Sequence, residues 1–434
     1  MNKGFKTILA AICAATAAAA QAADFGAEAV DGAAWDMTVK SFCAAHAGEG
    51  FRFLTSARDS VNCTQPGAVN VAGFGVYETR IWFSGPRGAE PKISRAEFSL
   101  YNKGDAGKPL SREDLDAMLE AVRASFPAAE ARWEKGTKNE KMGAVVHSQR
   151  FFGKKADGQL AWGTDKRGGT VNFVRLALVP PGTMKRTSEG ALSRSAESVK
   201  SGVEKRKNGD VVINGVPMVD QGEKGYCAAA TAERVLRYYG LEIDEHELAQ
   251  MAGTTADGGT GTGAMIDAVA KIGNANRLGK NELYRADGDM RTFEKNLELY
   301  NQTAKRMRRP QIDIRQYTTG NMVDGNAISD AYDPDVLKAA RLKQSAAFKR
   351  FMAGVKTQVD RGVPLFWGVT LGYVKEPDIP QARGGHMRLI TGYNEKTKEI
   401  IYTDTWGAGH EEKRMSQEDA WTITTALFFL KPLR

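Results

Sequence analysis

The segment from Pro217 to Gly240 carries the residues best suited to nucleophilic chemistry. Its sequence, PMVDQGEKGYCAAATAERVLRYYG, places Cys227 at the start of a predicted helix that ends before Gly240. A thiol at a helix N-terminus lies at the positive end of the helix dipole, which stabilises the thiolate. Because the thiolate is the nucleophilic form, this position predicts a reactive cysteine. The alternative is a buried structural cysteine on a core helix.

Gln221 is the second candidate, six residues before Cys227 and separated from it by a turn-rich sequence. Such a turn can bring the side-chain amide of Gln221 back beside Cys227. The amide NH2 and the backbone N–H of Cys227 would then form an oxyanion hole, which stabilises a tetrahedral intermediate. The alternative is a solvated glutamine with no chemical role.

A thiolate requires a general base, and the base requires a group that orients it. Among the five histidines, His386 has the most suitable context, because it follows two glycines and opens the apolar strand pattern MRLITGY. A turn, NEKTK, then leads to a second strand pattern that ends at Asp404. Asp404 would fix the tautomer of His386 and stabilise its imidazolium form.

The register of this hairpin decides whether the pair can meet. A register with Tyr393 opposite Glu399 makes His386 the diagonal neighbour of Asp404 on one face, about 7–8 Å away at Cα. Arg388 would then face Asp404 directly and could capture it as an ion pair. A slip of one residue would put the two side chains on opposite faces.

The remaining histidines and the glycine-rich sequence suggest no further chemistry. GTGTG at 259–263 lacks the Lys-Ser/Thr ending of a phosphate loop. No pair of His or Cys has metal-ligand spacing, so we expect no metal and no cofactor. The histidines without a suitable context are His46, His147, His246 and His410.

The N-terminus predicts export. Residues 1–23 combine a positive start at Lys3 and Lys6, an Ala-rich apolar stretch and the small-x-small sequence Ala-Gln-Ala. This pattern is typical of a secretory signal peptide, so we expect a periplasmic or secreted protein after its removal. A lipoprotein anchored at Cys13 is the less favoured alternative. No later stretch has the roughly 18 apolar residues that span a bilayer.

Three cysteines remain after removal of the signal peptide. In an oxidising compartment Cys43 and Cys63 are close enough in sequence to form a disulfide. Such a loop would stabilise the fold by about 3 kcal/mol in the chain-entropy model. Cys227 would then be the odd cysteine, as expected of a reactive thiol.

Composition excludes several classes of protein. The 434 residues are 42% hydrophobic, which excludes a largely disordered chain, and the net charge is only +8. No run of Lys and Arg is interleaved with aromatic residues, so we expect no nucleic-acid partner.

Two domains must position the candidate residues. Residues 24–180 predict a mostly antiparallel α+β domain, with half-buried strands near 77–83 and 96–100 and a helix after the capping box at Ser111. Residues 181–209 form a basic polar linker, and residues 210–434 form the second domain. Within the latter, we expect helices near 290–300 and 348–359 and strands at 364–371, 387–393 and 399–404.

The order of these motifs resembles the papain-like cysteine peptidases, especially the bacterial branch related to bacteriocin-leader-processing peptidases. The motifs are QGEKGYCAAA, RYYG, GGHMRLITGY and YTDTWG. GTGTGAMIDAVAKIG and VDRGVPLFWGV are similar to the segments between them. The resemblance covers roughly residues 211–274 and 350–434, whereas about 275–345 is an insertion, expected to form a lid, a subsite wall or a merely structural element.

The resemblance implies a papain-like domain in which a helix bearing the cysteine packs on an antiparallel sheet bearing the histidine and aspartate. Cys227 would be the nucleophile, His386 the base and then acid, Asp404 its orienter and Gln221 the oxyanion donor. Four positions depart from the usual pattern and leave the substrate open: Tyr226, Ala228, Arg388 and Thr405.

The resemblance therefore implies a secreted or periplasmic peptidase that acts on a peptide or protein through a thioester acyl-enzyme. Another acyl-transfer enzyme, such as a transglutaminase, deamidase or amidase, is the first alternative. An inactive secreted binding protein is the second. The N-terminal domain is interpreted as a binding or targeting module, or as an inhibitory pro-segment that covers the active site and is released by cleavage in 181–209, with the first slightly favoured.

Overall fold

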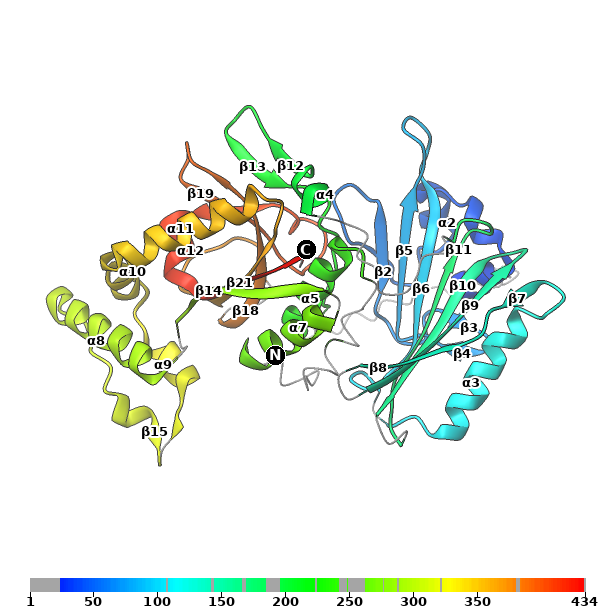
Figure 1. Cartoon of the computed structure of the whole chain (residues 1–434), viewed down its shortest axis with the longest axis horizontal. Coiled ribbons are helices and arrows are strands. Elements are labelled where there is room, and N and C mark those ends of the chain that lie inside the picture. Colours follow the sequence, from blue (N-terminus) through cyan, green and yellow to red (C-terminus); the bar gives the residue numbers. More distant parts are fainter. Residues whose placement is uncertain are drawn as a thin grey trace, which may run out of the picture.

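The computed structural model describes residues 24–432, apart from 107, 142–143, 166–168, 185–195, 223–224, 242–247, 249–261, 276, 287–288, 321 and 380–382. The expected signal peptide and His246 lie outside the described residues. The described chain is a mixed α+β protein with two large, separate, antiparallel sheets (Figure 1).

The first sheet has nine strands in the order β1-β2-β5-β6-β11-β10-β9-β7, with β8 paired to β9. Helices α1 (Phe25–Asp31), α2 (Val39–Ala45) and α3 (Arg112–Ser125) belong to the same N-terminal part. The strands are β1 (Arg52–Phe53), β2 (Ser60–Cys63), β5 (Glu78–Ser84), β6 (Lys92–Asn102), β7 (Ala131–Trp133), β8 (Thr137–Lys141), β9 (Ala144–Gly153), β10 (Asp157–Asp165) and β11 (Val171–Val179). A small hairpin, β3 (Asn70–Val71) and β4 (Phe74–Gly75), packs beside α1.

Strand β5 shows why alternation alone mispredicts burial. Ile81 and Phe83 face the core formed with α1, α2 and α3. Arg80, on the opposite face, is also buried, and it pairs with Glu233 of helix α5 (Cys227–Tyr238) in the second domain. The strand expected to be half-buried is therefore covered on both faces.

The second sheet has eight strands in the order β12-β13-β18-β17-β21-β14, with β19 paired to β18 and to β20. The strands are β12 (Val203–Lys205), β13 (Asp210–Ile213), β14 (Leu278–Arg285), β17 (Leu365–Leu371), β18 (Gly384–Asn394), β19 (Glu399–Thr403), β20 (Lys413–Ser416) and β21 (Thr424–Pro432). Helix α4 (Ala196–Lys200) and β12 fall within the segment predicted to be a linker, and β12 forms one edge of this sheet.

Helix α5 (Cys227–Tyr238) lies between the second sheet and the N-terminal sheet (Figure 1). It packs on β18, where the Thr231 hydroxyl donates to the carbonyl oxygen of Met387 at 3.2 Å. Its long buried face, which includes Val235 and Leu236, joins the core around Trp367. Helices α7 (Thr262–Ala275), α11 (Ser345–Val359) and α12 (Gln417–Ile423) complete this core.

The segment predicted as an insertion, about 275–345, begins with β14, which belongs to the second sheet, and its remainder forms a helical layer at the outer end of the second domain (Figure 1). It has its own small apolar cluster around Tyr300, Ile312 and Ile328. Its elements are α8 (Met290–Met307), η2 (Ile314–Tyr317), β15 (Thr318–Thr319), β16 (Met322–Val323), α9 (Gly325–Ala331) and α10 (Pro334–Lys343).

The β18–β19 hairpin differs from its predicted register at the turn. Tyr393 pairs with Ile400 instead of Glu399, so the ladder begins one residue out of step. A bulge between Ile390 and Gly392 then shifts the ladder by one residue, and the remaining pairs continue toward Arg388 and Asp404 as expected. A Cβ at position 392 would lie 2.6 Å from a carbonyl oxygen of β13, which explains the glycine at the bulge.

The predicted disulfide between Cys43 and Cys63 is wrong. Both thiols are free, with Cys43 exposed on α2 and Cys63 buried in β2. The Cys63 thiol donates instead to the carbonyl oxygen of Glu49 at 2.9 Å. Proximity along the chain did not bring the sulfurs together, because the two elements place them in different environments.

Candidate active site

Cys227 is the first residue of α5, as predicted, and is half-buried. The first helical hydrogen bond runs from the Ala230 N–H to the Tyr226 carbonyl oxygen at 2.8 Å. Tyr226, at the N-cap position, supplies no side-chain capping bond. The N–H groups of the first turn, including that of Cys227, therefore point toward the thiol end of the helix.

His386 and Asp404 meet as the hairpin register requires. His386 Nε2 lies 2.5 Å from Asp404 Oδ1, and both side chains are fully buried. The indole of Trp406 stacks on the imidazole with ring centroids 4.3 Å apart and planes 5° from parallel. This ring shields the hydrogen bond from water and fixes the plane of the imidazole.

The other imidazole nitrogen, Nδ1, is not used by Asp404. It has no conventional hydrogen-bond partner among the described residues, and the Cys227 thiol interacts with this side chain. Asp404 thus holds one nitrogen and leaves the second for proton exchange with sulfur.

The electrostatics favour a thiolate–imidazolium pair. Burial alone would raise the pKa of Cys227, but the hydrogen bond and charge of His386 lower it below the usual thiol value. Burial would lower the pKa of His386, but Asp404 and Cys227 raise it to about 9. Burial opposes ionisation of Asp404, yet His386 and Arg388 hold its pKa well below the ordinary value.

Gln221 is buried and is held by the residue that follows Asp404. Its Oε1 accepts a hydrogen bond from the Thr405 hydroxyl at 2.5 Å, and its backbone N–H donates to the Thr405 carbonyl oxygen at 2.9 Å. Because the amide oxygen is engaged, the amide NH2 is turned away from Thr405. Thr405, a departure from the family pattern, also donates its N–H to Asp404 Oδ1 at 3.0 Å.

Arg388 does pair with Asp404, but it does not displace His386. Arg388 Nε lies 2.7 Å from Asp404 Oδ2, the carboxylate oxygen that His386 does not use. The guanidinium also pairs with Glu376 at 3.0 Å, and Glu376 accepts a hydrogen bond from the Tyr402 hydroxyl at 2.5 Å. Both carboxylates are therefore satisfied without loss of the imidazole contact.

Arg234, which sequence reasoning missed, ties α5 to the other catalytic segments. Its Nε donates to the Pro217 carbonyl oxygen at 2.7 Å and its Nη1 to the Asp404 carbonyl oxygen at 2.7 Å. Its Nη2 donates to the Thr403 hydroxyl at 2.6 Å. Burial lowers the pKa of Arg234 to about 10, which still leaves it charged at neutral pH. The only sequence signal was an arginine within an otherwise apolar helix face.

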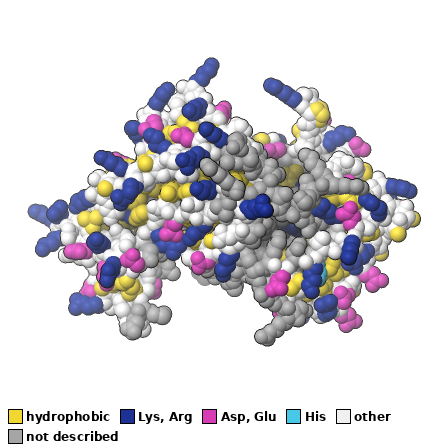
Figure 2. Space-filling model, viewed as in Figure 1, with side chains coloured by type: hydrophobic (Ala, Val, Ile, Leu, Met, Phe, Trp, Pro, Cys, Tyr) yellow, Lys and Arg dark blue, Asp and Glu magenta, His cyan; other side chains and the backbone are white. Residues whose placement is uncertain are grey.

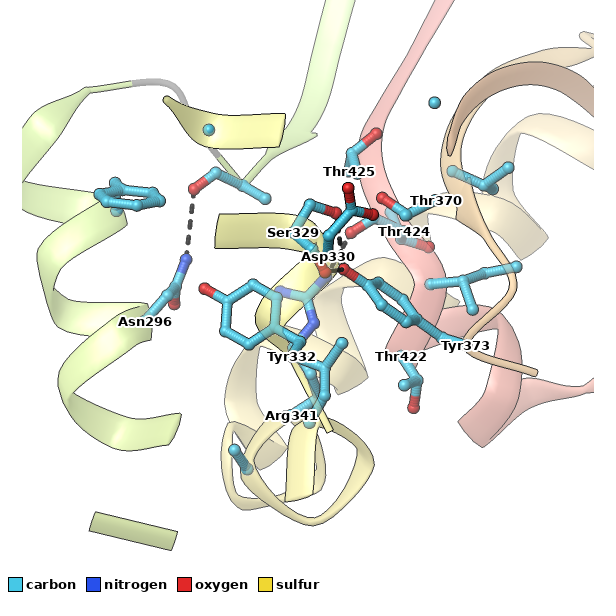
Figure 3. Close-up of a pocket in the computed structure, with 18 of the residues that line it drawn as sticks. Asn296, Ser329, Asp330, Tyr332, Arg341, Thr370, Tyr373, Thr422, Thr424 and Thr425 are labelled. Carbon is cyan, nitrogen blue, oxygen red and sulfur yellow. Dashed lines mark hydrogen bonds between the residues drawn. The ribbon is translucent and has the colours of Figure 1, made fainter. Parts of the chain in front are cut away.

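A cavity of about 700 Å³ lies next to the histidine strand. Gly384 and Gly385, directly before His386, line it together with α8, α9 and α10 (Figure 3). The rings of Tyr332 and Tyr373 form part of its wall, and the Tyr373 hydroxyl is 2.6 Å from that of Ser329 (Figure 3). Four threonines supply further hydroxyl groups to the wall: Thr370, Thr422, Thr424 and Thr425.

The surface shows charge of both signs. Figure 2 shows Lys and Arg side chains spread over the visible face and interspersed with Asp and Glu. None of the helices in the described ranges is long and apolar enough to cross a membrane.

One comparison with known protein families gives a match in the C-terminal part of the chain. Residues 290–427 match the model of the Peptidase_C39 like family. The match includes His386 and Asp404 and begins downstream of Cys227, inside the segment interpreted as an insertion. The C-terminal region of the chain is therefore a C39-like cysteine peptidase family domain, which confirms the predicted enzyme class.

The wider comparisons add less. The crystal structure of xylellain, a cysteine protease from Xylella fastidiosa, aligns with 58% of this chain and 100% of its own chain, at 12% identity and a TM-score of 0.26. No curated protein sequence matches the chain.

Proposed function

We propose that this protein is an exported papain-like cysteine peptidase that hydrolyses peptide bonds through Cys227, His386 and Asp404. The observation that carries the proposal is the buried His386, which Asp404 holds at 2.5 Å through Nε2 and whose hydrogen bond and charge lower the pKa of the Cys227 thiol. A merely structural cysteine would not require a buried, charge-stabilised imidazole as its neighbour.

The first half of the reaction forms an acyl-enzyme. The Cys227 thiolate attacks the peptide carbonyl carbon, and the developing oxyanion is held by the Cys227 N–H and the Gln221 amide. The His386 imidazolium then donates its Nδ1 proton to the amine nitrogen as the carbon–nitrogen bond breaks. The products are the free amine and a thioester on Cys227.

The second half restores the enzyme. His386, now neutral, accepts a proton from water as the water oxygen attacks the thioester carbonyl. The intermediate collapses with loss of the Cys227 thiolate and release of the carboxylic acid. The thiolate–imidazolium pair is thereby regenerated, and Asp404 again stabilises the cation.

The cavity beside Gly384 and Gly385 supports a peptide as the substrate. A peptide bound at His386 would pass its mouth, and the phenol rings of Tyr332 and Tyr373 offer apolar surface with polar edges. We infer that the segment 290–344 forms a subsite wall that receives a substrate side chain.

Export is the second part of the proposal. The pattern of residues 1–23 supports a signal peptide and hence a periplasmic or secreted enzyme. N-terminal sequencing of the protein isolated from its native host tests this, and retention of residues 1–23 would contradict it.

The experiment compares the mature protein with its Cys227→Ala variant on a diverse peptide mixture under reducing conditions. Cys43→Ser, which removes an exposed thiol far from the triad in sequence, is the matched control. New peptide termini that need Cys227 but not Cys43 are the expected result, read by mass spectrometry. Deamidated or crosslinked products without new termini would favour the acyl-transfer alternative, and no products at all would favour a binding protein.

A further inference from the structure

We propose that the N-terminal domain is a permanently docked part of the catalytic unit, whose β5–β6 face clamps the nucleophile helix in position. This proposal replaces both earlier interpretations of the domain, a detachable inhibitory segment and an independent binding module. It concerns the interface itself, so its first test does not depend on the proposed peptidase activity.

The outer side of α5 meets the N-terminal sheet through ion pairs. Arg80 Nη1 on β5 lies 2.7 Å from Glu233 Oε1, and Arg237 Nη2 lies 2.8 Å from Glu97 Oε2 on β6. Glu233 and Arg237 also pair with each other along the helix at 2.6 Å. The Arg237 guanidinium lies over the ring of Trp82, 5.3 Å from its centroid.

The burial of these charges distinguishes a built interface from a chance contact. The side chains of Glu233, Arg80 and Glu97 are 0%, 5% and 6% exposed. Surface ion pairs contribute little, whereas a buried carboxylate that loses its partner is strongly destabilising. Separation of the domains would break the Arg80–Glu233 and Arg237–Glu97 pairs together, whereas Glu233 would keep its pair with Arg237.

The N-terminal domain also contacts the loop that follows Asp404. There the backbone N–H of Ser56 donates to the carboxylate of Glu411. The segments of Cys227 and Asp404 are therefore both in contact with the N-terminal domain.

The opposite side of α5 explains why this brace matters. Arg234 and Thr231 tie the helix to the catalytic strands, so α5 is held between two layers. Loss of one layer would allow the helix N-terminus to shift relative to His386. Small displacements of a nucleophile cost large factors in rate.

The test introduces a specific protease site within 185–195 of the full chain, followed by cleavage and size-exclusion chromatography. We expect the two pieces to co-elute at 0.15 M salt, roughly the physiological ionic strength, and Cys227 to be alkylated at the uncleaved rate. Pieces that separate would overturn the proposal, and separation with a faster reaction of Cys227 would identify an inhibitory segment.

Substitutions in the cleaved protein assign the interaction to the ion pairs. Arg80→Met should weaken association of the pieces by about 30-fold or more, the usual effect of truncating one partner of a buried charge pair. Arg112→Gln, which removes an exposed pair with Asp116 at 3.7 Å, is the control and should leave association unchanged. Circular dichroism of each variant checks folding, and equal affinity in a folded Arg80→Met protein would contradict the proposal.

Discussion

Two clusters of buried charged residues lie on either side of the nucleophile helix, and they have different roles. In the Asp404 cluster, two cations share one carboxylate, and the result is a pair of shifted pKa values at the reacting groups. In the interface cluster, Arg80, Glu233 and Arg237 alternate in charge and hold two domains together. Substitution in the first should therefore change chemistry and its pH dependence, and substitution in the second should change association and stability.

The largest effect is expected at the centre of the Asp404 cluster. Asp404→Asn should lower kcat/KM by about 10³-fold or more, because the imidazolium loses its counter-ion and its orientation. Steady-state kinetics on a substrate identified in the peptide screen would measure this. A matched substitution, Asp419→Asn, removes a carboxylate outside the triad and should retain most activity.

The second largest effect is on stability. Arg234→Met removes three hydrogen bonds that join α5 to the catalytic loops and should cost about 3–5 kcal/mol of unfolding free energy. Denaturant unfolding of the Cys227→Ala protein would measure it without self-cleavage. A loss below about 1 kcal/mol, the value of one ordinary hydrogen bond, would show that Arg234 is not an anchor.

The pH dependence of activity should distinguish the Asp404 cluster from the interface cluster. Activity should rise as Cys227 ionises, at a pH below that at which an ordinary thiol ionises. Activity should fall near pH 9, where His386 loses the proton that it must donate to the leaving amine. The paired substitution Arg388→Met with Glu376→Gln removes a positive charge near Asp404 and should move the upper limb to higher pH by up to about one unit. Arg80→Met should leave both limbs in place, and a shift there would erase the distinction between the clusters.

The smallest effect is expected at Thr405. Thr405→Val removes the hydroxyl that fixes the Gln221 amide and should lower kcat by about fivefold, equivalent to roughly 1 kcal/mol. Thr405→Ser retains the hydroxyl and should restore most of the rate. Equal rates for the valine and serine variants would show that this hydrogen bond does not position the oxyanion donor.

The sequence predicted the elements near the site because each has a strong local signal. Cys227 begins a helix with good formers, His386 lies at the start of a strand, and Asp404 directly follows the next strand after a short turn. Their mutual position did not follow from pairing alone, since the turn register differs by one residue and a bulge corrects it.

The partners that come from elsewhere in the chain could not be predicted in this way. Glu376 lies in an irregular segment with no periodic pattern, yet it neutralises the second cation of the Asp404 cluster. Arg80 and Glu97 have the alternation of solvent-facing strand residues, but both are buried and pair with residues of α5. Such contacts depend on how distant parts of the chain pack, which no local sequence pattern shows. The disulfide predicted between Cys43 and Cys63 was wrong for the same reason, because closeness in sequence does not fix the positions of two side chains in the fold.

The most direct test of the central claim is the rate of Cys227 alkylation by iodoacetamide as a function of pH, resolved by peptide mass spectrometry. The exposed thiol of Cys43 in the same molecule serves as the internal reference. We predict that Cys227 reacts as a thiolate well below the pH range of ordinary thiols, and that His386→Ala moves its titration back into that range. If Cys227 titrates as an ordinary thiol in the unsubstituted protein, the thiolate–imidazolium pair does not exist and the proposed mechanism is wrong.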